Sequence, residues 1–521
     1  MAVFNQHSRT DNARKSSILG ITNQLMRYVL AFVYRTVFLL VLTKEYLGLE
    51  GLFTNILAIL QLAELGIGVA IVYRMYKPIQ QEDVHKVAAY MNFYKWVYRI
   101  IALVILVVGL ILLPFLDFFI KDTAEIPADI DIKVLYLFFL LQSVTSYLFV
   151  YKQSILTADQ KGYTVSIFSI IVQTIRYVVM FPMLILTKNY PLTLGVSIAT
   201  VVVTNYILSW VTHRKYREVF VLKDKLTKEE KKEILKDTSA MMCHKVGEAL
   251  VFGIDSILVS KYVGTGMLGI YSNYSLLINA VTGLLTQFLG SFIASLGNLS
   301  ILSDDANKMK VYKRLIFLNN WVVCFCTVSM FVLINPFIRI WQGADMLLPM
   351  TTVAALSASF FINNARWVTN SYITASGLFT KDKWRPFVQA AINLVASILL
   401  VKAIGITGIF VGTIISCVTT IWWREPHVLH KYELHASVGT YWFRHAVTVL
   451  LTAGICVGCY FLSNLLDASF ASFMIRVAMC VVIPNGLMAL LYCRSQDMRF
   501  YVDYVLRRLH IRKDPPKTDN A

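Results

Sequence analysis

The sequence has few charged residues for its size. Only 15% of its 521 residues are Asp, Glu, Lys or Arg, whereas 57% are hydrophobic and the mean hydropathy is +0.61. A soluble protein of this length needs far more polar surface, because globular chains are about 25% charged. Apolar windows of about 20 residues, long enough to span a bilayer, recur along the whole chain. The sequence therefore indicates an all-α polytopic membrane protein.

Acidic residues are scarcer than basic ones, with 31 Asp and Glu against 49 Lys and Arg and a net charge of +18. In a soluble protein, such an excess would suggest a nucleic-acid partner. In a membrane protein it follows from the enrichment of Lys and Arg in cytoplasmic loops. We therefore expect no nucleic-acid partner.

Several signatures of other protein classes are missing. No GxxxxGK[ST] phosphate loop occurs, which excludes ATP hydrolysis by that route. The first apolar run, 17–42, is too long for a signal peptide and precedes no small-residue cleavage site, so it is predicted to be the first membrane helix. The eight cysteines lie almost all in apolar runs, and the pair Cys456/Cys459 has no soluble redox domain around it. We therefore expect no disulfides.

The apolar runs predict fourteen membrane-spanning helices. Basic residues concentrate in alternate loops and at both ends of the chain, which places these loops and both termini in the cytoplasm. The loops on the other side are short, and the longest of them, 121–133, is acidic. The predicted spans are 18–42, 47–74, 93–119, 132–156, 163–186, 191–212, 240–262, 266–296, 314–340, 346–374, 384–403, 406–424, 440–463 and 469–492.

The chain resembles itself at an offset near 217 residues. GLFTN (51–55) matches GIYSN (269–273), and SILTA (154–158) matches SYITA (371–375), in constant order. Two parallel six-helix lobes are therefore expected, around a central cavity that opens alternately to either side of the membrane. The predicted divisions are an N-lobe at 1–212, a basic cytoplasmic linker at 213–239, a C-lobe at 240–425, two extra helices at 426–496 and a basic amphipathic tail on the inner leaflet at 497–521.

Arginines lie inside the predicted spans, where a charge costs at least about 2.5–3.5 kcal/mol and normally faces a wet cavity or a partner. Guanidinium binds phosphate in a bidentate manner and keeps its charge when it is desolvated. We therefore predict a cationic cavity that receives an anion such as a diphosphate. The predicted substrate-binding residues are Arg27, Arg35, Arg176, Arg366, Asn273 and Asn363.

Other predicted spans also contain ionisable residues. His244, Glu248 and Asp255 fall on one helical stripe, and Glu64 lies in the second span. We interpret these residues as groups that balance the cavity's charge or bind a coupling cation, Na⁺ or H⁺. For any single arginine, pairing with a carboxylate such as Glu64 or extension to the membrane surface is the alternative. No third ligand accompanies His244 and Glu248, so we predict neither a metal site nor a catalytic site.

Three stretches resemble the polysaccharide transporter (Wzx-like) family of the MOP flippase superfamily: LAELGIGVAIVYRMYKPI (62–79), KDTSAMMCHKVGEALVFGIDSILVSKYVG (236–264) and LGIYSNYSLLINAV (268–281). The resemblance implies a flippase, not an enzyme. It implies transport of undecaprenyl-diphosphate-linked oligosaccharide from the inner to the outer leaflet of the bacterial plasma membrane, for O-antigen or capsule assembly. It also implies that Arg27 and Arg35 lie in the lumen. Polysaccharide polymerases and glycosyltransferases are candidate partners, besides the membrane lipids.

Three alternatives remain open at this point. A flippase for another lipid-linked precursor, of peptidoglycan or teichoic acid, would have the same sequence features. A drug or cation antiporter of the same superfamily would need cavity carboxylates without several arginines. A membrane glycan polymerase or glycosyltransferase would need a sizeable outer loop or an acidic metal-binding motif. The outer loops are short, and the stretch that resembles such a motif, SDD (303–305), is better interpreted as a solvated turn.

Overall fold

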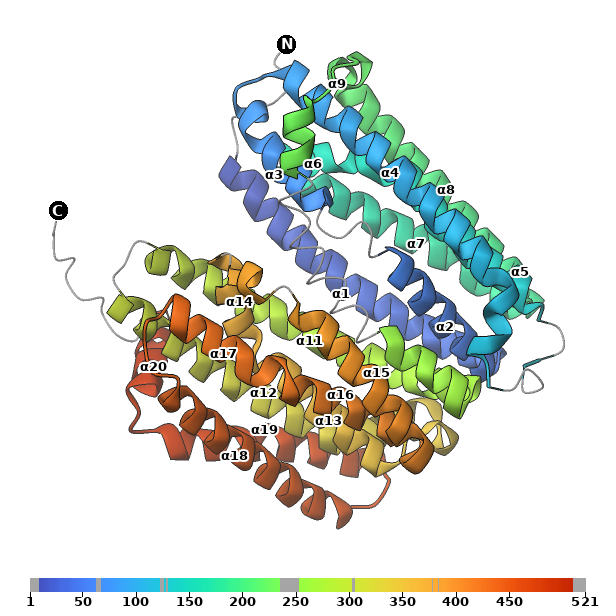
Figure 1. Cartoon of the computed structure of the whole chain (residues 1–521). Coiled ribbons are helices and arrows are strands. Elements are labelled where there is room, and N and C mark those ends of the chain that lie inside the picture. The colour runs from blue at the N-terminus through green and yellow to red at the C-terminus, as the bar shows by residue number, and fades with distance from the viewer. Residues whose placement is uncertain are drawn as a thin grey trace. The chain divides into compact units, whose positions relative to one another are not determined.

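In the described ranges of the chain, every regular element is a helix (Figure 1). Ten of these helices are long and apolar enough to cross a membrane. The protein is therefore an all-α multi-pass membrane protein, as the composition predicted. The computed structural model describes residues 9–61, 67–121, 126–127, 130–234, 253–301, 305–376, 378–382 and 384–508.

The contacts within the chain divide it into two compact units. Unit 1 comprises Met1–Leu276 and Asp382–Ser416, and unit 2 comprises Leu277–Lys381 and Cys417–Ala521. The lobes and further divisions expected from the internal repeat stay predictions.

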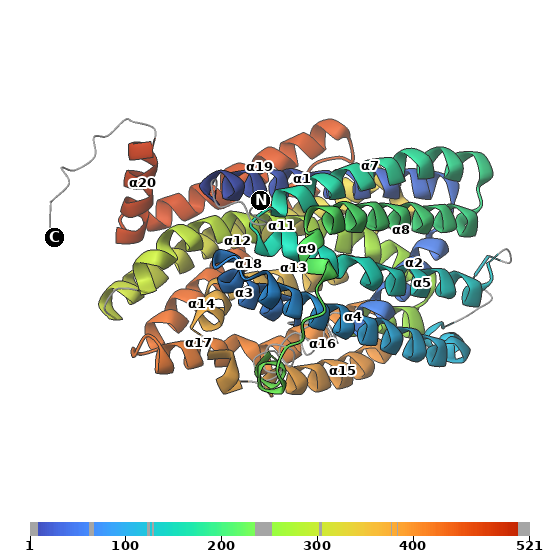
Figure 2. The same cartoon turned by 90° about the horizontal axis from the view of Figure 1, so that it is seen from above.

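The helices of unit 1 pack as a bundle of long neighbours, some parallel and some antiparallel. α1 packs along α7, α4 along α5, and both α5 and α7 against α8 (Figures 1 and 2). The elements are α1 (Arg9–Val41), α2 (Lys44–Leu60), α3 (Ile67–Gln80), α4 (Val84–Leu112), η2 (Leu113–Phe119), α5 (Ile132–Val150), η4 (Tyr151–Gln153), α6 (Ser154–Ala158), α7 (Gly162–Thr187), α8 (Tyr190–Lys215), α9 (Arg217–Val221), the π-helical turn η5 (Val259–Val263), the start of α11 (Thr265–Ile301), α15 (Arg385–Ile404) and most of α16 (Ile406–Thr419).

Several helices of unit 1 begin at a side chain that accepts hydrogen bonds from the first backbone amides. Asp83 accepts from Lys86 N at 2.9 Å before α4, and Asp131 accepts from Lys133 N at 2.9 Å before α5. Asn189 does the same before α8, where Pro191 occupies the first turn. These caps satisfy amides that have no partner within the helix. They explain where the long apolar helices begin.

The core of unit 2 is formed around α12, against which α18 and α19 pack. One cluster there contains Cys324, Cys459 and Cys480, and none of the seven cysteines in the described part of the chain forms a disulfide. The amphipathic tail is helical over α20, where the Tyr501 hydroxyl donates to Arg314 O on α12 at 3.1 Å. The elements are the rest of α11, α12 (Asp305–Gln342), η6 (Ala344–Met346), α13 (Met350–Ala365), α14 (Trp367–Ala375), η7 (Leu378–Asp382), α17 (Ile421–Tyr432), α18 (Gly439–Asn464), α19 (Phe470–Tyr492) and α20 (Gln496–Arg508).

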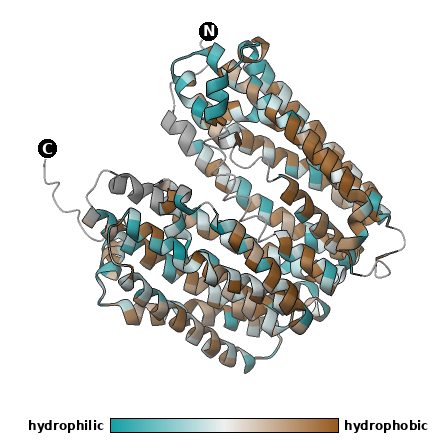
Figure 3. Cartoon of the chain, viewed as in Figure 1, coloured by the Kyte–Doolittle hydropathy of each residue, from teal (hydrophilic) through white to brown (hydrophobic). Residues whose placement is uncertain are grey.

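Ten of the fourteen predicted spans coincide with the ten membrane-length helices. Figure 3 shows the hydrophobic residues concentrated along such helices, for example on the middle and later part of α4. The other four predicted spans are not confirmed as spans. Two of them, 47–74 and 240–262, include residues outside the described ranges, 266–296 lies in α11, and 346–374 is divided at Arg366 between α13 and α14.

Candidate polar sites within the helical units

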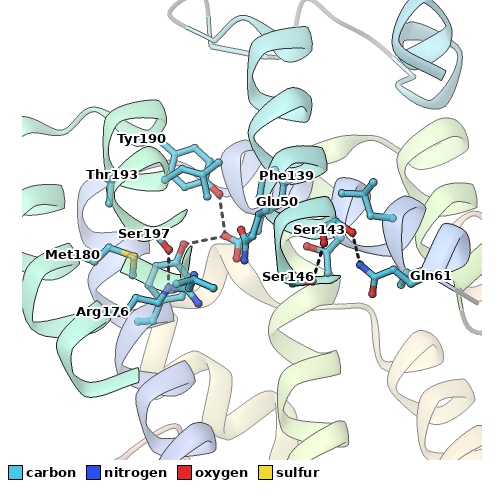
Figure 4. Close-up of a pocket in the computed structure, with 17 residues that line it drawn as sticks. Glu50, Gln61, Phe139, Ser143, Ser146, Arg176, Met180, Tyr190, Thr193 and Ser197 are labelled. Carbon is cyan, nitrogen blue, oxygen red and sulfur yellow. Dashed lines mark hydrogen bonds between the residues drawn. The ribbon is translucent and has the colours of Figure 1, made fainter. Parts of the chain in front are cut away.

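A polar cavity lies inside unit 1, among α1, α2, α5, α7 and α8 (Figure 4). Its volume is about 300 Å³. The polar side chains that line it recur one helical turn apart, as Gln142 and Ser146 do on α5 and Thr193 and Ser197 do on α8. Residues four apart share one helix face. Each of these apolar helices therefore turns a polar stripe toward the same interior space.

Glu50 on α2 holds two tyrosines in this cavity. Its carboxylate accepts hydrogen bonds from the Tyr34 hydroxyl at 3.0 Å and the Tyr190 hydroxyl at 3.3 Å. Figure 4 shows Glu50 between Arg176 and Ser197 on one side and Gln61 and Ser143 on the other. No basic side chain lies within 4.0 Å of Glu50 in the described part of the chain. In the described part of the chain, its side-chain hydrogen bonds are thus those from the two tyrosine hydroxyls.

Arg176 on α7 supplies the positive charge of this cavity. Its Nε donates to Ser197 Oγ at 2.6 Å, and its guanidinium lies 5.7 Å from the centre of the Tyr177 ring. It makes no ion pair with an acidic residue among those that the structure describes. The cavity thus contains one cation and one carboxylate that do not neutralise each other directly.

The two arginines predicted on α1 have different environments. Arg35 is half-buried, and its Nη1 donates to Ser272 Oγ on α11 at 2.8 Å. Arg27 is exposed, and its Nη2 donates to Gln24 Oε1 on the same helix at 2.6 Å. Arg35 thus links α1 to α11 through a hydroxyl, and within the described ranges neither guanidinium has an acidic partner.

A second polar cluster in unit 1 surrounds Asp255. The Asp255 side chain is only 4% exposed, and the Thr413 hydroxyl on α16 lies 3.1 Å and 3.0 Å from its two oxygens. Asn393 Nδ2 on α15 donates to the same Thr413 oxygen at 2.9 Å, and Asn393 Oδ1 is buried without a hydrogen-bond partner. No basic residue of the described chain pairs with Asp255. A buried carboxylate without a counter-charge is costly, so it favours a bound proton or cation.

Asn273 lies one residue after the Ser272 that contacts Arg35. It is fully buried, and neither its amide nitrogen nor its amide oxygen has a hydrogen-bond partner in the described part of the chain. Buried amide groups are almost always hydrogen-bonded, to protein or to ordered water. The side chain is thus available to a small polar group or an ion inside unit 1.

Helices α2 and α11 cross closely beside these residues. A Cβ atom on Gly48 would lie 1.9 Å from Thr265 O, and a Cβ atom on Gly269 would lie 2.0 Å from Lys44 O. The contact is reciprocal, with the glycine of each helix facing a backbone carbonyl one turn before the glycine of the other. Small residues permit such close backbone approach between membrane helices. The crossing fixes the position of the α11 segment that carries Ser272 and Asn273.

In unit 2, Arg366 is paired with a carboxylate. Its Nη1 lies 2.6 Å from Glu425 Oε1 on α17, and the two side chains are 11% and 2% exposed. The charge of Arg366 is therefore compensated locally. The neighbouring Asn363 donates to Ser359 O at 2.9 Å, while its Oδ1 is buried without a partner.

The structure brings only part of the predicted site together. Arg35, Asn273 and Asp255 lie in unit 1 with Arg27 and Arg176, whereas Arg366 and Asn363 lie in unit 2. The predicted roles of these residues stay predictions, and Glu64, His244 and Glu248 lie outside the described residues. The partners that sequence reasoning missed include the hydroxyl groups of Ser272 and Ser197. They also include Glu50, Asn393, Thr413 and Glu425.

Two of these omissions had a signal in the sequence. Glu50 lies inside the predicted span 47–74, and Glu425 directly follows the predicted span 406–424. An acidic residue within or at the end of an apolar run is expensive and calls for a partner. The involvement of Thr413 and Asn393 had no such signal, because hydroxyl and amide residues are common in membrane helices. In the described chain, no group of three or more His, Cys, Asp or Glu could hold a metal ion.

Several solved structures of membrane transporters have a similar architecture. Among solved structures, the lipid II flippase MurJ in an inward closed conformation is similar, with a TM-score of 0.63 and 15% identity over 92% of this chain and 99% of that one. An inward-facing MATE family multidrug resistance transporter of the MOP superfamily has a TM-score of 0.59 and 14% identity, over 80% of this chain and 99% of that one. A MOP superfamily transporter from Pyrococcus furiosus has a TM-score of 0.51 and 12% identity, over 82% of this chain and 97% of that one.

At these identities the likeness concerns the fold, which is that of flippases and transporters. The comparison with curated proteins gave no match. Residues 13–294, more than half of the chain, match the profile of the family described as polysaccharide biosynthesis protein. The chain therefore belongs to the polysaccharide biosynthesis protein family.

Proposed function

We propose that this protein is a flippase for undecaprenyl-diphosphate-linked oligosaccharide repeat units. It moves them from the inner to the outer leaflet of the bacterial plasma membrane for the assembly of a surface polysaccharide such as capsule or O-antigen. The family and the fold support a transporter of this kind. The observation that carries the proposal concerns the hydrogen bonds of Arg35 and Arg176. Both arginines lie on apolar helices, and their described hydrogen-bond partners are hydroxyl groups rather than carboxylates.

The hydroxyl partners suit an anionic substrate. Ser272 and Ser197 satisfy part of each guanidinium but leave its charge uncompensated. A phosphate oxygen is a stronger acceptor than a serine hydroxyl, because charge-assisted hydrogen bonds are roughly twice as strong as neutral ones. In the proposed cycle, a diphosphate replaces these hydroxyl groups on the guanidinium nitrogens. The oligosaccharide then uses neutral polar groups such as Gln61 and Ser146, while the lipid chain stays in the bilayer.

The cluster around Asp255 is proposed to bind the coupling cation, Na⁺ or H⁺. The carboxylate, the Thr413 hydroxyl and the unpartnered Asn393 oxygen form an oxygen-rich set from three separate segments of unit 1. Oxygen ligands of this kind suit hard cations. Because these side chains join α15 and α16 to the Asp255 segment, cation or proton binding there would change how the three segments pack.

The remaining predicted residues keep their proposed roles. Arg27, Arg366, Asn273 and Asn363 are proposed to contribute to the substrate path. His244, Glu248 and Glu64 are proposed to balance charge. Both termini are proposed to be cytoplasmic, with polysaccharide polymerases and glycosyltransferases as functional partners.

The proposal is tested in a strain whose surface polysaccharide depends on this chain. Arg35→Ala and Arg176→Ala should insert normally, lower the export of polymer about ten- to a hundredfold and cause lipid-linked repeat units to accumulate. That factor corresponds to the loss of a charged hydrogen bond worth about 1.5–3 kcal/mol. Arg35→Lys and Arg176→Lys should restore part of the export. Arg494→Ala, at an exposed arginine after α19, is the matched control and should export normally.

Unchanged export by both alanine variants would remove the proposal. A lipid II flippase is among the structural neighbours, so a role for a peptidoglycan precursor is the second candidate. It is favoured if the chain rescues a strain depleted of its own lipid II flippase but leaves surface polysaccharide unaffected.

A further inference from the structure

The segment that follows α9, residues 222–234, is fixed to the surface of unit 1, and we refer to it as the tether. Asn92 Nδ2 on α4 donates to Leu222 O at 2.9 Å and Asp224 O at 3.1 Å. Asp224 Oδ2 lies 2.9 Å from His85 Nδ1, and Glu230 forms an ion pair with Lys86. The tether therefore crosses the start of α4 in a defined position (Figure 2).

The end of the tether has its own local structure. Residues 228–234 are helical. Thr227 Oγ1 accepts from Glu230 N at 3.2 Å, and Glu230 Oε2 accepts from Thr227 N at 3.0 Å. This reciprocal pair is a capping box, which stabilises the first turn of a helix. Asp224 and Glu230 thus hold the tether on α4, and Glu233 pairs with Arg74 on α3. In the described part of the chain, the tether's lysines form no ion pair with these acidic residues.

A cavity of about 540 Å³ lies between the tether and α4. The α4 side of its wall includes Asn92, Phe93 and Trp96, and the Trp96 side chain is 60% exposed. The tether side includes three lysines, none of which forms an ion pair in the described chain: Lys223, Lys225 and Lys231. The single acidic residue of the lining, Asp224, is paired with His85. We refer to this space as the lysine cavity; its net charge is positive.

The α4 wall of the lysine cavity continues directly into an apolar stripe. Ala89, Asn92, Phe93 and Trp96 lie at spacings of three and four, so they share one face of the helix. The same face carries large hydrophobic side chains that are all exposed in unit 1: Ile100, Leu103, Val104, Val107 and Ile111. Figure 3 shows this part of α4 as strongly hydrophobic. We call this set the α4 stripe, and in a membrane it faces acyl chains.

We propose that the lysine cavity binds the headgroup of an anionic phospholipid, from the leaflet on the side of the tether. The phosphate meets the ammonium groups of Lys223, Lys225 and Lys231. The Trp96 ring, amphipathic and placed between the basic cavity and the apolar stripe, lies at the level of the headgroup, as interfacial tryptophans do. The acyl chains then run along the α4 stripe. An anionic phospholipid fits this site because the cavity is positively charged and continues into an exposed apolar helix face.

The experiment is native mass spectrometry of the purified full chain, titrated with phosphatidylglycerol and, separately, with zwitterionic phosphatidylcholine. The Lys223→Gln/Lys225→Gln pair should weaken phosphatidylglycerol binding about 30-fold, which corresponds to about 1 kcal/mol per lysine. Lys228→Gln/Lys232→Gln is the matched control, because it removes the same charge from exposed positions of the same segment that do not line the cavity. Lys223→Arg/Lys225→Arg should bind phosphatidylglycerol as the parent does.

Trp96 provides a second and independent variant. Trp96→Ala should weaken phosphatidylglycerol binding, whereas Trp96→Tyr, which keeps an amphipathic ring, should retain most of it. Equal weakening by the two lysine pairs would overturn the proposal, because binding would then depend on general charge and not on the cavity. Equal affinity of the parent chain for the two lipids would overturn it as well.

Discussion

Replacing Gly48 by alanine tests the crossing of α2 and α11. The added Cβ atom would lie 1.9 Å from Thr265 O, about 1.5 Å closer than the 3.4 Å at which ordinary contacts begin. The obstacle is a backbone carbonyl, which no rotamer change can move. Either the two helices separate locally or the start of α11 shifts. Overpacking of this kind costs about 1–3 kcal/mol, and we expect the upper half of that range.

The same reasoning applies to Gly269, whose Cβ atom would lie 2.0 Å from Lys44 O. Because both alanines push the same two helices apart, we expect the double variant to cost clearly less than the sum of the single variants. Separation of the helices also displaces Ser272 from Arg35, so transport should fall together with stability.

The assay is the midpoint of thermal unfolding of the purified protein in detergent, followed for each variant with the export assay in cells. Gly290→Ala on the same helix α11 is the control, because its Cβ atom would meet nothing within 4 Å. It should leave the midpoint unchanged or raise it slightly, since alanine has the higher helix propensity. The reasoning is refuted if Gly48→Ala and Gly269→Ala behave like Gly290→Ala, or if their effects add.

Three further variants test the other charged groups. Asp255→Asn should fold but lose the dependence of transport on the Na⁺ or pH gradient, measured in proteoliposomes; a retained dependence would exclude Asp255 as the cation site. Glu425→Gln should lower the stability of the folded chain by about 3–5 kcal/mol, because it removes the carboxylate that pairs with the buried Arg366. The double variant Arg366→Met/Glu425→Leu should lose less stability, and equal losses of stability in the two variants would argue against the buried pair. Because Lys86 lowers the pKa of Glu230, the stabilisation from this ion pair is complete above the ordinary glutamate pKa of about 4.3 and is lost as the pH falls through the lower folded value. At neutral pH, trypsin should therefore cleave the tether of Glu230→Gln faster than that of the control Glu229→Gln, by a factor that corresponds to less than about 1 kcal/mol. Equal cleavage rates of the parent chain and Glu230→Gln at pH 7 would contradict this.

The membrane helices could be predicted from the sequence because apolar length is a local property. A run of about 20 apolar residues spans a bilayer whatever lies elsewhere in the chain, and ten predicted spans coincide with membrane-length helices. The end of α13 at Ala365 was not predicted, because the run 346–374 as a whole is apolar enough to be predicted as one span. The caps at Asp131 and Asn189 likewise explain helix starts that hydrophobicity alone places only approximately.

The polar contacts could not be predicted in the same way, because they join residues that are distant in the sequence. The Arg35–Ser272 hydrogen bond spans 237 residues, and the Asp255–Thr413 contact spans 158. Sequence reasoning identified which residues are too costly to leave in lipid, such as Arg35, Arg176 and Asp255. It could not identify Glu425 as the partner of Arg366, since that pairing depends on how α14 and α17 pack within unit 2.

The exposure of the cysteines that the structure describes has a practical consequence. Among the seven that the structure describes, Cys493 at the end of α19 is the one that is exposed, while the others are buried or half-buried. Buried thiols in apolar surroundings react slowly, so among these seven cysteines a maleimide reagent should modify Cys493 first. The native chain thus contains an attachment point for a fluorophore or spin label beside α20. In whole cells, an impermeant maleimide would report directly on which side of the membrane this end of the chain lies.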